Sequence, residues 1–141
     1  MAARGRLTAL ALAVLGSTIS AYLTWVHYSG QLALCRGAGG CETVQASRYA
    51  ELAGWPVALL GLIAFLAVTI LATLRLRADA PPWMLTALFG ITLAGTIFAA
   101  YLTGLEVFVI HAICPWCVAV DSAMAALFVV ALLELRATPR A

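Results

Sequence analysis

Four cysteines in two close pairs are the residues of this sequence best suited to chemistry. Cys35 and Cys41 enclose five residues, three of them glycine, so this segment can fold back and bring both sulfurs to disulfide distance. Cys114 and Cys117 form a C-x-x-C sequence, a spacing typical of disulfide-exchange sites. Pro115 suits the first turn of a helix, and a helix N-terminus there favours the thiolate. The two pairs together predict thiol–disulfide exchange.

Two alternatives compete with redox chemistry at these cysteines. In the first, the chain is a non-enzymatic membrane subunit with two static disulfides. However, a disulfide that closes so short a loop as Cys35–Cys41 adds little to the stability of the fold, and short, exposed disulfides are commonly labile. In the second, all four cysteines bind zinc. Zinc knuckles usually enclose two to four residues rather than five, and an oxidising compartment disfavours four thiolates. We therefore expect no metal.

Four apolar runs must position the cysteines. Of the 141 residues, 65% are hydrophobic and 10% charged, which excludes an ordinary soluble domain, and the scattered arginines exclude a nucleic-acid binder. Each run has 20 or 21 residues, enough to cross a bilayer as a helix. The runs cover residues 7–26, 55–74, 83–103 and 114–133, with an outer loop at 27–54. The sequence predicts an all-α integral membrane protein: one domain over residues 1–141, built as a four-transmembrane-helix bundle.

The arginines predict how this bundle lies in the membrane. Six of the eight lie on one side of a four-span arrangement and two on the other. By the positive-inside rule, both termini are cytoplasmic, and the loop 27–54 and the turn 104–113 are outside. Both cysteine pairs then lie on the extracytoplasmic, oxidising side of the cell membrane. A cleaved signal peptide is an alternative for the first run, although its apolar stretch is longer than the usual 7–15 residues or so.

The order of the motifs resembles a known family. A C-x5-C pair comes first, and the chain then carries Ser47-Arg48, Gly54-Trp55-Pro56 at the start of an apolar run with Gly61, and finally Cys114-Pro115-Trp116-Cys117. From Tyr22 to Asp121 this order resembles the bacterial homologues of vitamin K epoxide reductase, in the single-domain form without a fused thioredoxin-like domain. The DsbB-type disulfide oxidases differ, because they carry C-x-x-C in the first loop.

The resemblance implies a quinone-dependent disulfide oxidoreductase that supports disulfide bond formation. Menaquinone or ubiquinone would accept the electrons, and the partner would be an extracytoplasmic thioredoxin-like, DsbA-like protein. Since the chain ends eight residues after the last run, we expect that partner to be a separate protein. By resemblance, Cys35 and Cys41 are the shuttle pair, Cys114 accepts electrons from them, and Cys117 faces the quinone. Which loop cysteine meets Cys114 stays open.

Ser47 and Asp121 are further candidates for the quinone site. By resemblance, Ser47 helps to arrange the cysteines and the quinone; alternatively, it is the N-cap of a short helix over residues 48–52. Asp121 follows the two C-x-x-C cysteines at i+7 and i+4, on nearly the same helix face. An acid within a span predicts function, here proton donation to quinone. The alternative is a carboxylate capped by Ser122 or wetted within the bundle.

The remaining polar and aromatic residues near the C-x-x-C have two interpretations each. Tyr101, Phe98 and Trp116 either wall a quinone pocket or serve as packing and interfacial anchors. His111 either assists thiol deprotonation or is incidental. Glu106 is interpreted as a solvated turn residue. Vertebrate members of the family carry an Asn and a Tyr where Val57 and Asp121 stand, so the resemblance leaves open whether an epoxide is reduced.

Overall fold

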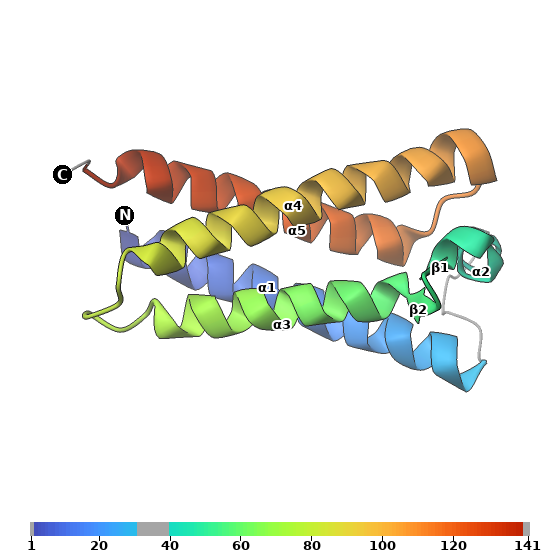
Figure 1. Cartoon of the computed structure of the whole chain (residues 1–141), viewed down its shortest axis with the longest axis horizontal. Helices are drawn as coiled ribbons and strands as arrows, with labels where there is room; N and C mark the ends of the chain where they lie inside the picture. The colour runs from blue at the N-terminus through green and yellow to red at the C-terminus, as the bar shows by residue number, and fades with distance from the viewer. Residues whose placement is uncertain (1, 31–39, 140–141) are drawn as a thin grey trace.

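Four long helices form the body of the molecule and run along its long axis (Figure 1). The computed structural model describes residues 2–30 and 40–139. The long helices are α1 (Ala2–Ser29), α3 (Val57–Leu74), α4 (Trp83–Leu105) and α5 (Pro115–Ala137). Each is long and apolar enough to cross a membrane, so the predicted four-helix membrane bundle is confirmed. Both termini lie at one end of the bundle (Figure 1).

The turn expected at residues 104–113 is largely helical, so this part of the prediction was wrong. Helix α4 ends at Leu105 and continues directly into η2 (Glu106–Ile110), a single π-helical turn. The chain leaves this turn at His111, which has a left-handed backbone with φ 55°. The reversal itself takes only the few residues before α5. Apolar residues 107–110 carry the helix past the point where the predicted span ended.

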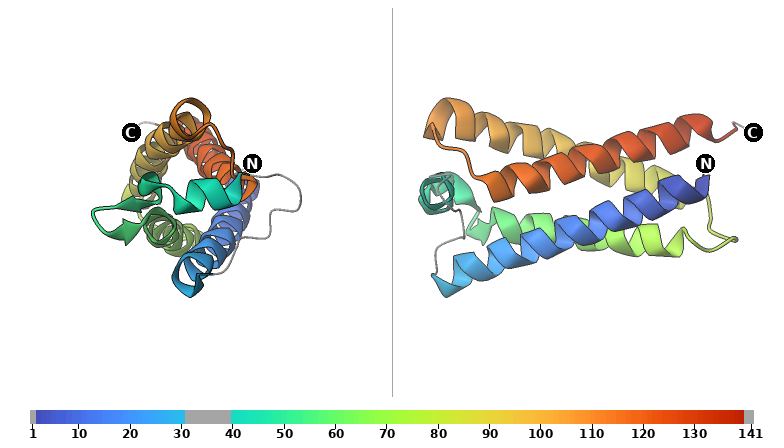
Figure 2. Two further views of the ribbon diagram at one scale, coloured as in Figure 1. Left: turned by 90° about the vertical axis from the view of Figure 1, so that its right-hand side faces the viewer. Right: turned by 180° about the vertical axis from the view of Figure 1, so that it is seen from behind.

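Short elements cover the end of the bundle opposite the termini. They are α2 (Cys41–Ala46), the 3₁₀ turn η1 (Arg48–Ala50), and the antiparallel strands β1 (Glu51–Leu52) and β2 (Trp55–Pro56). In the end-on view α2 lies across the mouth of the bundle (Figure 2). The predicted outer loop is therefore an ordered cap where it is described, and His27 Nε2 lies 3.2 Å from Glu51 Oε1, which links α1 to β1.

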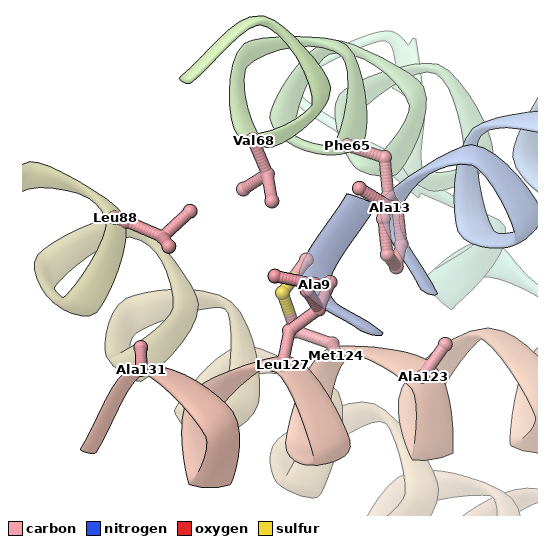
Figure 3. Close-up of a cluster of buried hydrophobic side chains, with 9 residues drawn as sticks. All are labelled: Ala9, Ala13, Phe65, Val68, Leu88, Ala123, Met124, Leu127 and Ala131. Atoms are coloured by element: carbon pink, nitrogen blue, oxygen red, sulfur yellow. The ribbon is translucent and has the colours of Figure 1, made fainter. Parts of the chain in front are cut away.

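The core of the bundle combines large side chains with small ones on α1. Phe65 and Val68 of α3 and Leu127 of α5 are fully buried (Figure 3). Facing them, α1 presents Ala9 and Ala13, and a Cβ on its Gly16 would lie 2.1 Å from the Phe65 ring. Small residues let membrane helices approach closely, which explains how α1 packs against α3 and α5.

A buried ion pair joins two helices near the termini. Arg75, the C-cap of α3, is 5% exposed and donates to the carboxylate of Glu134 on α5. A charge this well buried is tolerated when it has an opposite charge beside it. The Glu134 carboxylate is thus held by a fixed cation.

Candidate active site

The C-x-x-C sequence begins α5 as the sequence predicts. Cys114 is the N-cap and Pro115 occupies the first helical turn. The Cys117 backbone N–H donates to Cys114 Sγ over 3.4 Å, so the thiol satisfies a donor that the helix leaves free. Cys114 precedes the spanning helix. The hydrogen bond with the Cys117 side chain lowers the pKa of the Cys114 thiol, while burial works in the opposite direction.

Helix α2 brings Cys41 into the buried cluster that contains Cys114. Cys41 is 1% exposed, Cys114 is fully buried, and both belong to one buried cluster with Val26 and Val44. The approach is so close that a Cβ on Gly40 would lie 1.9 Å from the carbonyl oxygen of Ile113. The expectation of an exposed loop pair is therefore wrong for Cys41, because α2 docks against the segment before α5. Cys41 is disulfide-bonded. Cys35 lies outside the described residues.

A cavity opens on the other side of Cys117, within the bundle and beneath α2. It has about 990 Å³ of empty volume, including the part that is open to its surroundings. Helices α1, α3, α4 and α5 and the cap supply its lining, which is mostly aliphatic and aromatic. The polar members of the lining are Ser20, Gln45, Ser47, Tyr49, Glu106, Cys117 and Asp121. An apolar cavity with a few convergent polar groups is typical of a small-molecule or cofactor site.

Comparison with protein families identifies the chain. A model described as the vitamin K epoxide reductase family matches residues 7–132, which is most of the chain. The chain belongs to the vitamin K epoxide reductase family. It is therefore a membrane thiol–disulfide oxidoreductase linked to quinone, as the order of its cysteine motifs predicted. The mostly apolar lining of the cavity beside Cys117 suits a lipid-soluble molecule such as quinone, and among the described residues no three His, Cys, Asp or Glu gather as a metal site.

In this family member two polar side chains from different elements bond to the C-x-x-C. The Gln45 amide of α2 donates to Cys117 Sγ over 3.7 Å. The Glu106 carboxylate of η2 accepts the backbone N–H of Cys114 over 3.0 Å. Glu106 is 3% exposed, so its interpretation as a solvated turn residue was wrong. It is buried because the helix continues where a turn was expected.

Asp121 lines the cavity one turn beyond Cys117. The Thr103 hydroxyl of α4 donates to Asp121 Oδ2 over 2.6 Å. The partner of the carboxyl group is therefore Thr103 rather than the neighbouring Ser122. This hydrogen bond crosses from one helix to another and leaves the carboxyl group at the cavity wall.

Ser47 also lines the cavity, at the end of α2. It is the N-cap residue of η1, but its side chain caps no backbone N–H there. Instead its hydroxyl donates to the Val44 carbonyl oxygen over 2.8 Å. The expected helix at 48–52 is only the single turn η1, followed by β1. The hydroxyl closes the end of α2 over the cavity.

The aromatic candidates divide between the cavity and its surroundings. Phe98 lines the cavity. Tyr101 stacks against the Phe98 ring, with ring centroids 6.1 Å apart, but is 55% exposed and does not line the cavity. Trp116 packs against Tyr22 at 5.3 Å beside the Cys41–Cys114 cluster rather than in the cavity. His111 is exposed at the left-handed turn.

Sequence reasoning missed Gln45 and overlooked the position of Glu106. A signal for Glu106 was present, because Gly95, Ala99, Leu102 and Glu106 recur at helical spacing and all line the cavity. The apolar run was ended too early to include it. Gln45 follows Cys41 at i+4, which places the two on one face only once α2 is known to be a helix.

Proposed function

We propose that this protein reoxidises an extracytoplasmic thioredoxin-like, DsbA-like protein and passes the electrons to menaquinone or ubiquinone in the membrane. The observation that carries the proposal is the two-sided placement of the C-x-x-C. Cys114 packs against Cys41 of the cap, whereas Cys117 borders the apolar cavity. One cysteine pair can therefore meet a protein thiol on one side and a lipid-soluble oxidant on the other.

The first step is exchange between the two cysteine pairs. The partner reduces the loop disulfide, and the Cys41 thiolate then attacks Cys114 Sγ and breaks the Cys114–Cys117 bond. Attack by Cys35 on the Cys41 sulfur restores the loop disulfide and leaves Cys114 and Cys117 reduced. The shared buried cluster of Cys41 and Cys114 supports Cys41, rather than Cys35, as the cysteine that meets Cys114.

The second step returns the C-x-x-C to its disulfide. Cys114 and Cys117 together lose two electrons and two protons, and quinone takes up both to become quinol. Gln45 donates to the Cys117 sulfur and links α2 to the C-x-x-C at the cavity. Ser47 holds the end of α2 above the cavity through its bond to Val44. A quinone couple more oxidising than the disulfide drives the transfer, with 30 mV corresponding to about 1.4 kcal/mol.

Asp121 is proposed as a proton donor for quinone. Asp121→Asn keeps the size of the side chain and its acceptor for Thr103 but removes the acidic proton. We expect quinone reduction to slow by about 10²-fold or less, since water can substitute, while exchange between the cysteine pairs stays intact. The measurement is single-turnover quinone reduction against pH, with Asp79→Asn on the exposed α3–α4 loop as the matched control. An unchanged rate and pH profile would assign Asp121 to structure alone.

The proposed topology places the cap and all four cysteines on the extracytoplasmic side and both termini in the cytoplasm. The cap and the termini lie at opposite ends of the bundle, which is compatible with this orientation (Figure 1). After reduction of intact cells, we expect a membrane-impermeant thiol reagent to label Cys35 or Cys41 from outside. Labelling that occurs only after permeabilisation would show that the orientation is the reverse of the one proposed, and the cysteines would then not lie in the oxidising compartment.

The proposed function is tested by following quinone absorbance over time. The assay contains the purified protein, a reduced thioredoxin-like substrate and a soluble quinone analogue. We expect the absorbance to fall steadily and the substrate to acquire its disulfide in equal amount. The competing model of two static disulfides predicts cysteines that resist mild reduction and a quinone absorbance that does not change.

A further inference from the structure

Glu106 occupies a junction between the cysteine pair and the cavity. Its side chain is 3% exposed, lines the cavity, and accepts the Cys114 backbone N–H through Oε2 over 3.0 Å. Its own carbonyl oxygen accepts the Ala112 N–H over 3.0 Å, which fixes the π-turn beneath the reversal. A π-turn within a helix frequently marks a functional position. The carboxyl group is thus held at Cys114 from a rigid part of the backbone.

No cation holds this carboxyl group within the described ranges, 2–30 and 40–139. Glu134, the other largely buried glutamate, differs in this respect because Arg75 pairs with it. Burying a carboxylate without an opposite charge is costly, whereas an ion pair holds the charged form permanently. Glu106 is therefore built to exchange a proton, and Glu134 is built to keep its charge.

The proposed reaction needs a group that exchanges protons at this position. Oxidation of the two thiols releases two protons, and reduction of quinone consumes two. Cys117 borders the cavity, with Asp121 one turn further along α5, so the proton of Cys117 has a short route. Cys114 is fully buried and lies outside the cavity lining. A carrier that reaches from Cys114 to the cavity would give this proton a route of its own, besides the hydrogen bond between the Cys114 and Cys117 side chains.

We propose that Glu106 is this carrier: its carboxyl group takes up the proton that leaves the Cys114 thiol and delivers it to quinone in the cavity. This inference rests on the proposed function. For each turnover Cys114 and Cys117 form one S–S bond, two electrons pass to quinone, and Glu106 and Asp121 each relay one proton, so that both acids end as they began. The titratable groups that surround Glu106 are Cys114, Cys117 and Asp121 of α5 and Tyr49 of η1, in the cavity wall.

Two variants separate proton transfer from positioning. Glu106→Gln keeps the length and the carbonyl acceptor for the Cys114 N–H but cannot relay the proton, whereas Glu106→Asp keeps the acid and shortens the side chain. In single-turnover quinone reduction by the prereduced protein, we expect Glu106→Gln to be slower by about 10- to 10²-fold and Glu106→Asp to be the faster of the two. Glu106→Gln should also lose the part of the pH dependence that Glu106 contributes, while the part contributed by Asp121 remains. Glu42→Gln, on the exposed face of α2, is the matched control.

The outcomes distinguish this inference from the proposed function. If wild-type protein reduces quinone and Glu106→Gln matches it in rate and pH profile, the carrier role is overturned and the proposed function stands. If Glu106→Gln is the faster of the two variants, the carboxyl group only positions Cys114, and the inference is likewise overturned. If the wild type itself reduces no quinone, the proposed function fails first. Thermal melting of each variant and the rate of exchange between the two cysteine pairs, both expected to match wild type, show that the fold is retained.

Discussion

Replacing Cys117 by alanine is expected to abolish quinone reduction while leaving Cys114 able to capture the cap. The Cys117 sulfur borders the cavity, so its removal breaks the path of electrons to quinone. Cys114 remains beside Cys41 in the buried cluster, and without Cys117 a mixed disulfide between them can no longer be resolved from the C-x-x-C side, which leaves only Cys35 to resolve it. We expect this mixed disulfide to accumulate during oxidation of the partner and to appear as a cross-linked peptide after proteolysis and mass spectrometry.

A second substitution in the same background identifies the loop cysteine. Adding Cys41→Ala should remove the cross-link to Cys114, whereas adding Cys35→Ala should retain it once a thiol oxidant such as diamide is supplied, because that variant has no loop disulfide for Cys114 to attack. Near-normal turnover of Cys117→Ala would show that this thiol does not serve the quinone. A cross-link that survives Cys41→Ala but disappears with Cys35→Ala would show that the other loop cysteine meets Cys114.

Replacing Gly40 by alanine is expected to slow exchange between the cap and Cys114 by about 10²-fold. A Cβ at this position would lie 1.9 Å from the Ile113 carbonyl oxygen and 2.6 Å from its carbon, so backbone must move to admit it. Displacing α2 moves Cys41 relative to Cys114, and a misplacement of about 1 Å can cost about 10²-fold in rate. The measurement is the rate at which a reduced partner protein reduces the Cys114–Cys117 disulfide.

Gly90→Ala is the matched control, because a Cβ at Gly90 on α4 would meet nothing within 4 Å. We expect this variant to behave as wild type. Quinone reduction driven by a small, membrane-soluble dithiol should also survive in Gly40→Ala, since such a reductant bypasses the cap. Wild-type exchange in Gly40→Ala would show that close docking of α2 on Ile113 is not what brings the cysteines together.

Composition and local spacing predicted the spanning helices and the position of the C-x-x-C. A run of about 20 apolar residues in a bilayer has few options besides a helix, and Pro115 marks the start of α5. The continuation of α4 into η2 was not predicted, because a glutamate such as Glu106 normally faces water. Its burial depends on packing against the cap and α5, which local sequence does not encode.

The candidate site was predictable where it depends on cysteine spacing and not where it depends on tertiary contacts. The partner of Asp121 is Thr103, eighteen residues earlier, because α4 and α5 pack side by side. Likewise, the contact between Gln45 and Cys117 exists only because α2 folds across the mouth of the bundle (Figure 2). Neither pairing leaves a periodic signal in the sequence. The chemistry of the site was thus predictable from residue types, and its detailed partners were not.

The account is tested most directly by counting thiols against quinone in a single turnover. Fully reduced protein is mixed without oxygen with one equivalent of a soluble quinone analogue, and quinone absorbance is followed while the remaining free thiols are mapped by alkylation and mass spectrometry. We predict that one quinone is reduced for each disulfide formed in the protein, first at Cys114–Cys117 and then, after exchange, at Cys35–Cys41, and that Cys117→Ala reduces none. Quinone that stays oxidised, or quinol formed while all four cysteines remain alkylatable, would contradict it.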